Sequence, residues 1–104
     1  MTLRETEKLT NFCNKLIIKP NHETRGYYIY FEYKDKQYYA SLCMVKNIGA
    51  EVGIFAACDD YVTSWDYLYC RHPNDVSVKT LREHIYLFLE SLININNKQR
   101  KQNK

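Results

Sequence analysis

The chain has 104 residues, of which 45% are hydrophobic and 26% charged, and this size and composition indicate one small globular domain. Its formal net charge of +3 is too small to indicate nucleic-acid binding by itself, and it excludes an acidic mimic of DNA. Tyrosine is unusually abundant, with ten Tyr beside four Phe and one Trp. Most of the aromatic surface therefore carries a hydroxyl group, which suits half-exposed positions and interfaces.

The first residues, MTLRETEKLT, are polar and lack the apolar segment of a secretion signal. No apolar run reaches the length of a membrane span. The four cysteines are scattered and none belongs to a C-x-x-C pair. We therefore expect a cytoplasmic protein with reduced thiols at Cys13, Cys43, Cys58 and Cys70.

Residues 2–18 are predicted to form an amphipathic helix. Thr2 followed by Glu5 matches a capping box at its start. Pro20 is expected to end the helix, because proline disfavours the helical conformation of the residue before it. The apolar residues recur at helical spacing: Leu3, Leu9, Phe12, Cys13, Leu16 and Ile17.

Residues 27–45, YYIYFEYKDKQYYASLCMV, have the alternation of a β-hairpin and contain six of the ten tyrosines. Strands are predicted at 27–33 and 38–45. The KDKQ between them lacks glycine, so we expect a four-residue loop built on a type I turn. The more apolar side of each strand is assigned to the core: Tyr27, Ile29, Phe31, Tyr33, Ala40, Leu42 and Met44.

Two more strands and a helix are predicted after the hairpin. Residues 51–58 are apolar on both sides, which is typical of a central strand. Residues 65–70 place Trp65, Tyr67 and Tyr69 on one side. Ser77 is the best N-cap of the last helix, with Asp75 a close second. Its core-facing residues are expected to be Val78, Leu81, Ile85, Phe88, Leu92 and Ile95.

The predicted fold class is α+β: a helix, a four-stranded antiparallel meander sheet and a second helix, with both helices packed on one face of the sheet. Residues 1–96 form the single predicted domain. Residues 97–104, NKQRKQNK, contain no apolar side chain and are predicted to be a disordered basic tail.

The sheet face opposite the helices is the candidate functional surface. Alternation places on it the predicted partner-binding residues Tyr28, Tyr30, Tyr39, Tyr67 and Tyr69. Tyrosines give large contact area at low entropic cost, and the same rings could stack on nucleic-acid bases. Few basic residues interleave them, so a protein partner is favoured over RNA or DNA. A charged rim is expected from Arg25, Lys34, Lys36 and Arg71.

A homodimer is a further alternative, because the last helix has a wide apolar arc. The residues that widen it are Tyr86, Leu89 and Ile93. The first helix could cover this arc instead, and we favour that interpretation.

Metal binding and catalysis have weaker support. Of the cysteines and histidines, only Cys70 and His72 lie close in the sequence, and their spacing matches no standard zinc pattern. Asp59 and Asp60 are adjacent in a predicted turn and should point apart. A small enzyme with Cys58 or Cys70 as nucleophile remains an alternative, although no neighbouring sequence indicates an activated thiol. We expect no metal, no cofactor and no enzymatic activity.

Two families share features with this sequence. Double-stranded RNA-binding domains have a similar order of elements, but their GPxH-like loop and KKxAK-like cluster are replaced here by KDKQ and by SVKTLREH. The small size, the tyrosine-rich hairpin and the segments WDYLYC and DVSVKTLREHIYLFLESL resemble accessory proteins of phages and mobile elements, among them anti-CRISPR proteins. This resemblance implies an inhibitor or adaptor that binds a host defence enzyme, such as a CRISPR nuclease or its ribonucleoprotein complex.

Overall fold

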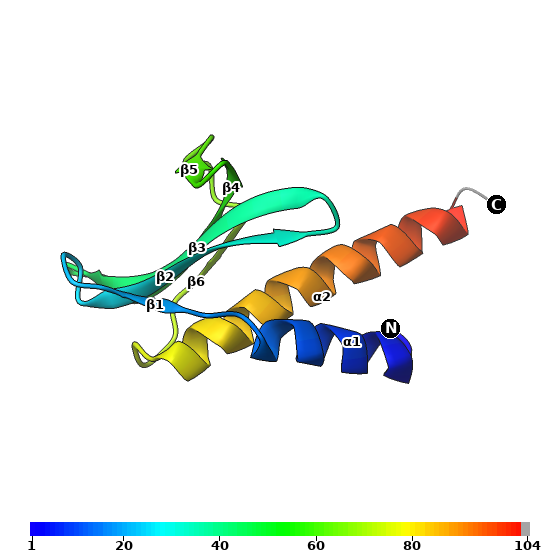
Figure 1. The fold of residues 1–104 in the computed structure, drawn as a ribbon, viewed down its shortest axis with the longest axis horizontal. Helices are drawn as coiled ribbons and strands as arrows, with labels where there is room; N and C mark the ends of the chain where they lie inside the picture. The colour runs from blue at the N-terminus through cyan, green and yellow to red at the C-terminus, as the bar shows by residue number, and fades with distance from the viewer. Residues whose placement is uncertain (103–104) are drawn as a thin grey trace.

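A computed structural model of the chain describes residues 1–102, and the chain folds into two helices and a curled antiparallel sheet (Figure 1). The helices are α1 (Leu3–Asn14) and α2 (Val78–Gln102). The strands are β1 (Lys19–Asn21), β2 (Gly26–Tyr33), β3 (Lys36–Val45), β4 (Gly49–Cys58), β5 (Tyr61–Val62) and β6 (Tyr69–Arg71). Neither helix, within the described range, is long and apolar enough to cross a membrane.

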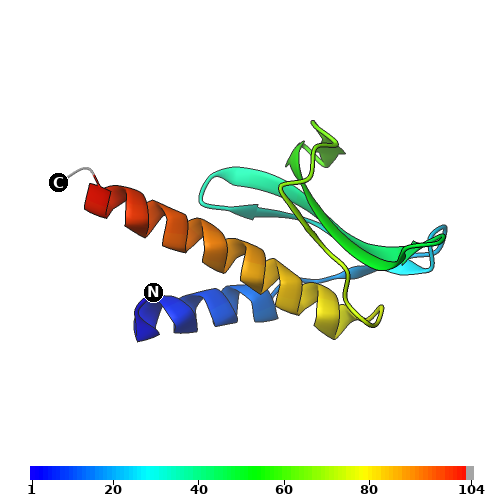
Figure 2. The same cartoon turned by 180° about the vertical axis from the view of Figure 1, so that it is seen from behind.

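The sheet confirms the predicted α+β class, but it has six strands instead of four. Its order is β1-β2-β3-β4-β5, and β6 pairs with the same β4 strand further along. Both helices lie on one side of the sheet (Figures 1 and 2). Helix α2 packs on β3 and β4, whereas α1 lies mainly against α2 and reaches the sheet through Phe12, whose ring contacts Phe31 and Tyr33.

Helix α1 begins as predicted and ends earlier than expected. The capping box is present, with the backbone N–H of Glu5 donating to Thr2 Oγ1 and the Glu5 carboxylate accepting from the Thr2 N–H. The helix stops at Asn14 instead of Ile18, and Pro20 lies in β1. Residues 15–18 thus connect the helix to the edge of the sheet.

The β2–β3 hairpin has a tighter turn than the predicted four-residue loop. Tyr33 pairs directly with Lys36, so only Lys34 and Asp35 form the turn. Their φ angles are 49° and 65°, the left-handed values that a two-residue type I′ turn requires. The expected type I loop is therefore wrong. A type I′ turn matches the right-handed twist of the long strands, and that match outweighs the absence of glycine.

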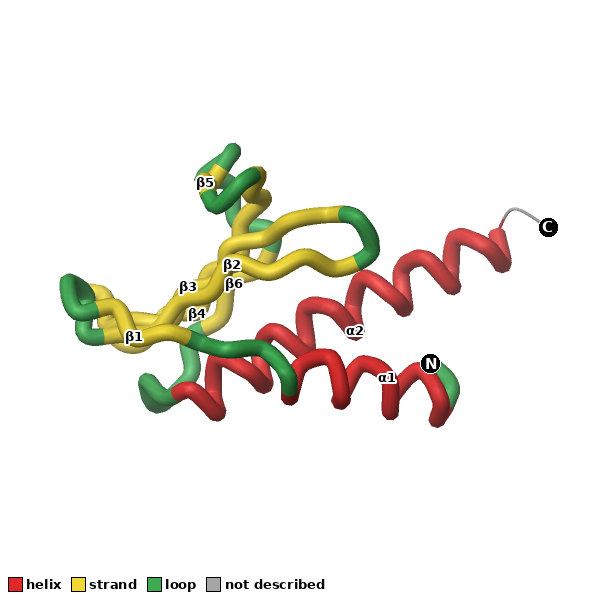
Figure 3. The backbone as a smooth tube through the Cα atoms, in the orientation of Figure 1, coloured by secondary structure: helices red, strands yellow, loops and turns green. Residues whose placement is uncertain are grey.

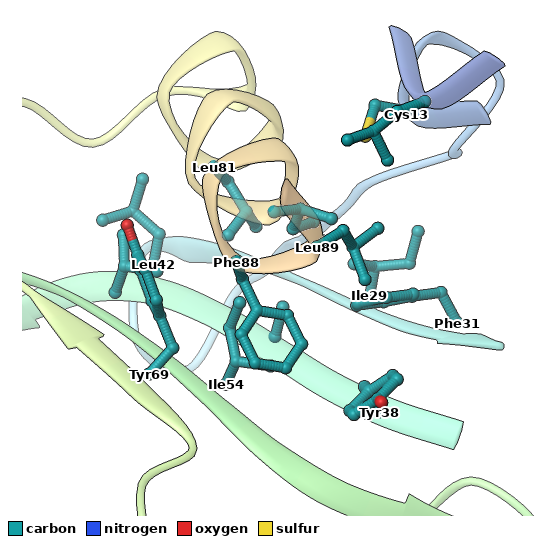
Figure 4. Packing of buried hydrophobic residues seen from close by; sticks show 14 of the residues in the cluster. Cys13, Ile29, Phe31, Tyr38, Leu42, Ile54, Tyr69, Leu81, Phe88 and Leu89 are labelled. Atoms are coloured by element: carbon teal, nitrogen blue, oxygen red, sulfur yellow. The ribbon is translucent and has the colours of Figure 1, made fainter. Parts of the chain in front are cut away.

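The core lies between the helix-facing side of the sheet and α2, and it follows the predicted phase of the hairpin. Figure 4 shows the sheet residues beneath the side chains of α2. Met44, predicted to be in the core, is 64% exposed because it lies near the end of β3, and Ile95 is also exposed. The largest fully buried side chains are Leu9, Leu42, Val52, Ile54, Leu81, Ile85 and Leu89.

The predicted fourth strand is mostly irregular chain (Figure 3). Only residues 69–71 pair with β4, and Tyr69 lies opposite the core residue Ile54. Tyr69 is consequently only 9% exposed, with its ring 6.0 Å from that of Phe88 (Figure 4). The alternation that relates Tyr67 to Tyr69 is broken between them. The placement of Tyr69 on the open face was wrong.

Helix α2 continues to Gln102, beyond the predicted end of the ordered domain at residue 96. Of the predicted tail, residues 103–104 lie outside the described residues.

Candidate protein-binding surface

The outer face of the sheet carries six neighbouring aromatic side chains, called here the outer aromatic cluster. Within the hairpin, Tyr30 and Tyr39 are register partners with ring centroids 4.8 Å apart, and Tyr28 lies 6.4 Å from Tyr30. The alternation of the hairpin sequence predicted these three tyrosines on this face. The members are Tyr28, Tyr30, Tyr39, Phe55, Trp65 and Tyr67.

The second half of the cluster is built on β4. Phe55 is only 6% exposed although it lies on the outer face, because other rings cover it. The centroids of Trp65 and Tyr67 lie 5.2 Å and 4.9 Å from that of Phe55. Trp65 also contacts Tyr39, at 6.2 Å, and so joins the two halves. These aromatic contacts form one continuous patch.

Gly53 provides the space in which two of these rings lie. A Cβ atom at this position would lie 2.9 Å from the Phe55 ring and 3.0 Å from the Tyr67 ring. The absence of a side chain therefore allows Tyr67 to approach β4 although residue 67 is outside any strand. Phe55 and Trp65 were not among the predicted partner-binding residues. Trp65 and Tyr67 are two residues apart, so alternation placed them on the same side, and this was the available signal for Trp65.

Exposure within the cluster is greatest in the segment before β6. Trp65 is 68% exposed and Tyr67 is 53% exposed. Tyr28, Tyr30 and Tyr39 are partly buried. A large indole that remains this exposed is an anchor candidate for a partner surface.

Three tyrosine hydroxyls of the cluster have raised pKa values. Burial, and then the nearby charge of Asp60, raises the pKa of Tyr30. Burial also raises the pKa of Tyr39, followed by the effect of Tyr30. The Tyr67 hydroxyl donates to Glu51 Oε1 at 2.5 Å, and this bond raises the pKa of Tyr67 to about 12. All three remain hydrogen-bond donors at neutral pH.

Acidic side chains border the outer aromatic cluster. Glu51 binds the Tyr67 hydroxyl, and Asp60 is close enough to Tyr30 to affect its pKa. Asp66 lies between the two exposed aromatic residues of the 63–68 segment. Glu32 shares the outer-face phase of Tyr30 on β2. The border thus carries four carboxyl groups, with Lys19, the register partner of Tyr28 on β1, as a basic neighbour at the sheet edge.

The predicted basic rim does not surround this cluster. The Lys34 ammonium lies 5.5 Å from the ring centroid of Tyr33, and the Arg71 guanidinium lies 4.5 Å from that of Tyr69. Both rings belong to the helix-facing side. Lys36 pairs with Tyr33 at the hairpin end, and Arg25 lies at the opposite end of β2 in a turn with φ 56°. These residues are exposed, but the fold does not bring them together.

The apolar arc of α2 is largely covered within the chain. Leu89 is fully buried, Ile93 is 5% exposed, and Tyr86 packs partly buried against the core. The alternative of a homodimer through these residues would therefore need the core to open. The favoured alternative, coverage within the chain, agrees with these positions.

Three of the four thiols have raised pKa values, which disfavour an activated nucleophile at those positions. Burial raises the pKa of Cys13 to about 11. Burial is also the main cause of the raised pKa values of Cys43 and Cys70, and the charge of Glu51 adds to both. Catalytic thiols need a lowered pKa.

Asp59 and Asp60 form the two-residue turn between β4 and β5.

A groove of about 550 Å³ opens on the other side of the molecule, between the sheet and α2. Its lining includes Tyr38, Leu68, Phe88 and Leu92. Asp35, Lys36 and Gln37 add polar groups at the hairpin end, and no member of the outer aromatic cluster lines the groove.

Comparison with family models, curated proteins and solved structures finds no match to this chain.

Proposed function

We propose that the protein is a non-enzymatic binding protein that docks on a protein partner through the outer aromatic cluster. The observation that supports this is the continuous patch of six rings, with Trp65 and Tyr67 exposed beside partly buried tyrosines. Isolated exposed aromatic residues are ordinary on protein surfaces, but a contiguous patch is typical of interaction sites.

The acidic border indicates the chemistry of the partner. Glu32, Glu51, Asp60 and Asp66 would complement a surface rich in lysine and arginine, whose side chains also bind the faces of aromatic rings. The same charges would repel the phosphates of a nucleic acid. A protein partner is therefore favoured over base stacking on these rings.

The resemblance to anti-CRISPR proteins suggests one class of partner. Nucleases of CRISPR systems hold nucleic acid in positively charged channels. An aromatic surface with an acidic border would fit such a channel and exclude its substrate. We therefore propose an inhibitor or adaptor that acts on a host defence nuclease or its ribonucleoprotein complex.

Affinity capture with matched variants tests this proposal. Wild type, Trp65→Ala and Leu87→Ala would be immobilised and exposed to a bacterial lysate with and without nuclease treatment. Leu87 is an exposed apolar residue of α2 and controls for loss of apolar surface. We expect a nuclease-resistant partner that binds wild type and Leu87→Ala but binds Trp65→Ala at least about 30-fold more weakly, as for an interface anchor.

Two outcomes would contradict the proposal. Equal capture by Trp65→Ala would remove the cluster as the docking site. Capture that disappears after nuclease treatment, together with a mobility shift of single-stranded RNA or DNA at low salt, would favour nucleic-acid binding. If a protein partner is captured, a guide-loaded CRISPR nuclease would be assayed directly for binding and cleavage. The double variant Tyr30→Ala, Tyr39→Ala would be the weakened comparison.

A further inference from the structure

Three potential metal ligands meet at the edge of the outer aromatic cluster. They are Glu51 on β4, Cys70 on β6 and His72 just after β6. One ligand atom from each residue lies within 4.8 Å of the other two. Among the side chains that the structure describes, this is the one group of three such ligands found at this proximity.

The pairing of β4 with β6 creates this arrangement. Cys70 lies opposite Gly53, so its side chain shares the outer face with Glu51, two residues away on β4. Because the two strands are antiparallel, the chain after Cys70 runs alongside the start of β4. His72 Nδ1 therefore lies 3.3 Å from the Ala50 carbonyl oxygen. Two strands that are distant in the sequence therefore supply sulfur, nitrogen and oxygen donors to one point.

Hydrogen bonds orient two of the three ligands. Tyr67 donates to Glu51 Oε1 and leaves Oε2 for a metal. When His72 Nδ1–H donates to the Ala50 carbonyl, Nε2 keeps its lone pair. Such bonds to the outer side of a ligand are typical of metal sites, where they fix the orientation of the coordinating group.

We propose that Glu51, Cys70 and His72 bind a zinc ion, with the fourth coordination position open to water. Thiolate, imidazole and carboxylate are the three ligand types of protein zinc sites, and a thiolate disfavours magnesium and calcium. Zinc–ligand bonds of about 2.0–2.3 Å place neighbouring donors about 3.3–3.8 Å apart. The observed separations of at most 4.8 Å can close to these values through a movement of up to about one ångström, which the exposed His72 side chain can make.

The surroundings are consistent with a bound cation. Cys43 lies opposite Glu51 on β3 and adds a second thiol nearby. Arg71, the nearest cation in sequence, directs its guanidinium to the Cys70 carbonyl and the Tyr69 ring. A bound ion would also connect β4 to the chain that carries Trp65 and Tyr67, because Tyr67 holds the Glu51 carboxylate.

Cobalt(II) is the probe for the test, since it reports thiolate coordination through a charge-transfer absorption band. The reduced full-length chain would be titrated with Co²⁺, and zinc would then be added to displace it. We expect one equivalent of cobalt with a thiolate band that zinc removes. Cys70→Ser should abolish the band, and His72→Ala should weaken binding by more than about 10-fold.

Matched variants keep the result specific. Cys58→Ser and His22→Ala change an exposed thiol and an exposed imidazole elsewhere, so cobalt binding should be unchanged. Zinc should raise the melting temperature of wild type and of these controls but not that of His72→Ala, whose fold is checked by circular dichroism. A missing band, an unchanged band in Cys70→Ser, or an equal loss in the control variants would overturn the proposal.

Discussion

The guanidinium of Arg82 on α2 donates to the carbonyl oxygen of Cys13 at the end of α1, with Nε 3.1 Å from the oxygen. A second bond, 3.0 Å long, joins Arg82 Nη2 to the carbonyl of Leu16. The last carbonyls of a helix have no partner inside it, and α1 has no basic residue in its last turn. The Cys13 carbonyl also accepts from the Leu16 N–H, so Arg82 adds a second donor there and supplies the donor of the Leu16 carbonyl just beyond the helix.

Replacing Arg82 should lower the free energy of unfolding. Arg82→Ala removes the donor of the Leu16 carbonyl and one of the donors of the Cys13 carbonyl, and we expect a loss of about 1–2 kcal/mol. Arg82→Lys should recover less than half of this loss, because one ammonium cannot reproduce the planar fork of the guanidinium. Urea unfolding at fixed pH measures both values. Lys79→Ala, an exposed change on the same helix, is the control, and full recovery by lysine would contradict the role of the fork.

Gly53→Ala should disturb the outer aromatic cluster. The new methyl group would lie about 3 Å from the rings of Phe55 and Tyr67, so both rings must move. Such overpacking costs about 1–3 kcal/mol. Trp65 is the single tryptophan of the chain and contacts Phe55, so its fluorescence emission should shift.

Gly49→Ala is the matched control for that experiment. Gly49 has φ +103° and nothing within 4 Å of the added Cβ, so this change strains the backbone without touching the cluster. It should lower stability while the emission of Trp65 in the folded state stays unchanged. The same emission shift in both variants would show that the rings respond to general destabilisation and not to the contact at Gly53.

The hairpin shows what the sequence could predict. Its two strands are long, so the alternation places Ile29, Phe31, Ala40 and Leu42 in the core with the correct phase. A slip of one residue would have exposed this entire set, and the burial of the core fixes the register. The outer positions of Tyr28, Tyr30 and Tyr39 follow from it.

The chain before β6 shows why the rest was not predictable. Trp65 and Tyr67 lie outside any strand. Tyr69 points toward the core because it pairs with the core residue Ile54. Alternation carries no information across an irregular segment. The proximity of Glu51 to Cys70 depends on the same long-range pairing. Metal-ligand spacing along the sequence cannot reveal a site that two separate strands assemble.

The turn of the β2–β3 hairpin should be improvable. Lys34 and Asp35 both adopt left-handed φ values, which cost residues with a Cβ about 1–2 kcal/mol each relative to the right-handed region. The double change Lys34→Asn, Asp35→Gly introduces the sequence that type I′ turns prefer. We expect the free energy of unfolding to rise by about 1 kcal/mol in urea denaturation. Lys36→Asn, next to the turn, should have little effect, and an unchanged stability in the double variant would contradict the turn type.

His84 should make stability depend on pH. Its Nδ1 lies 2.7 Å from the Tyr69 hydroxyl, and burial lowers the pKa of His84 below the ordinary value of 6.5, with Arg71 lowering it further against an opposing effect of Glu83. Between the lowered pKa and 6.5, the unfolded chain binds more protons than the folded chain, so stability rises with pH across this window. Below the lowered pKa His84 is protonated in both states, and its pH-dependent contribution to stability is lost.

Urea unfolding of wild type and His84→Gln at about pH 5 and about pH 7.5 measures this effect. Wild type should be less stable at the lower pH, and His84→Gln should show a smaller difference, since glutamine does not titrate. Hydrogen bonds to the Thr2 backbone and to the Thr80 side chain lower the pKa values of Glu5 and Asp75, so both carboxyl groups stay largely ionised at either pH. His22→Gln, at an exposed position, should keep the wild-type difference. An equal pH difference in wild type and His84→Gln would show that the Tyr69–His84 contact does not control this titration.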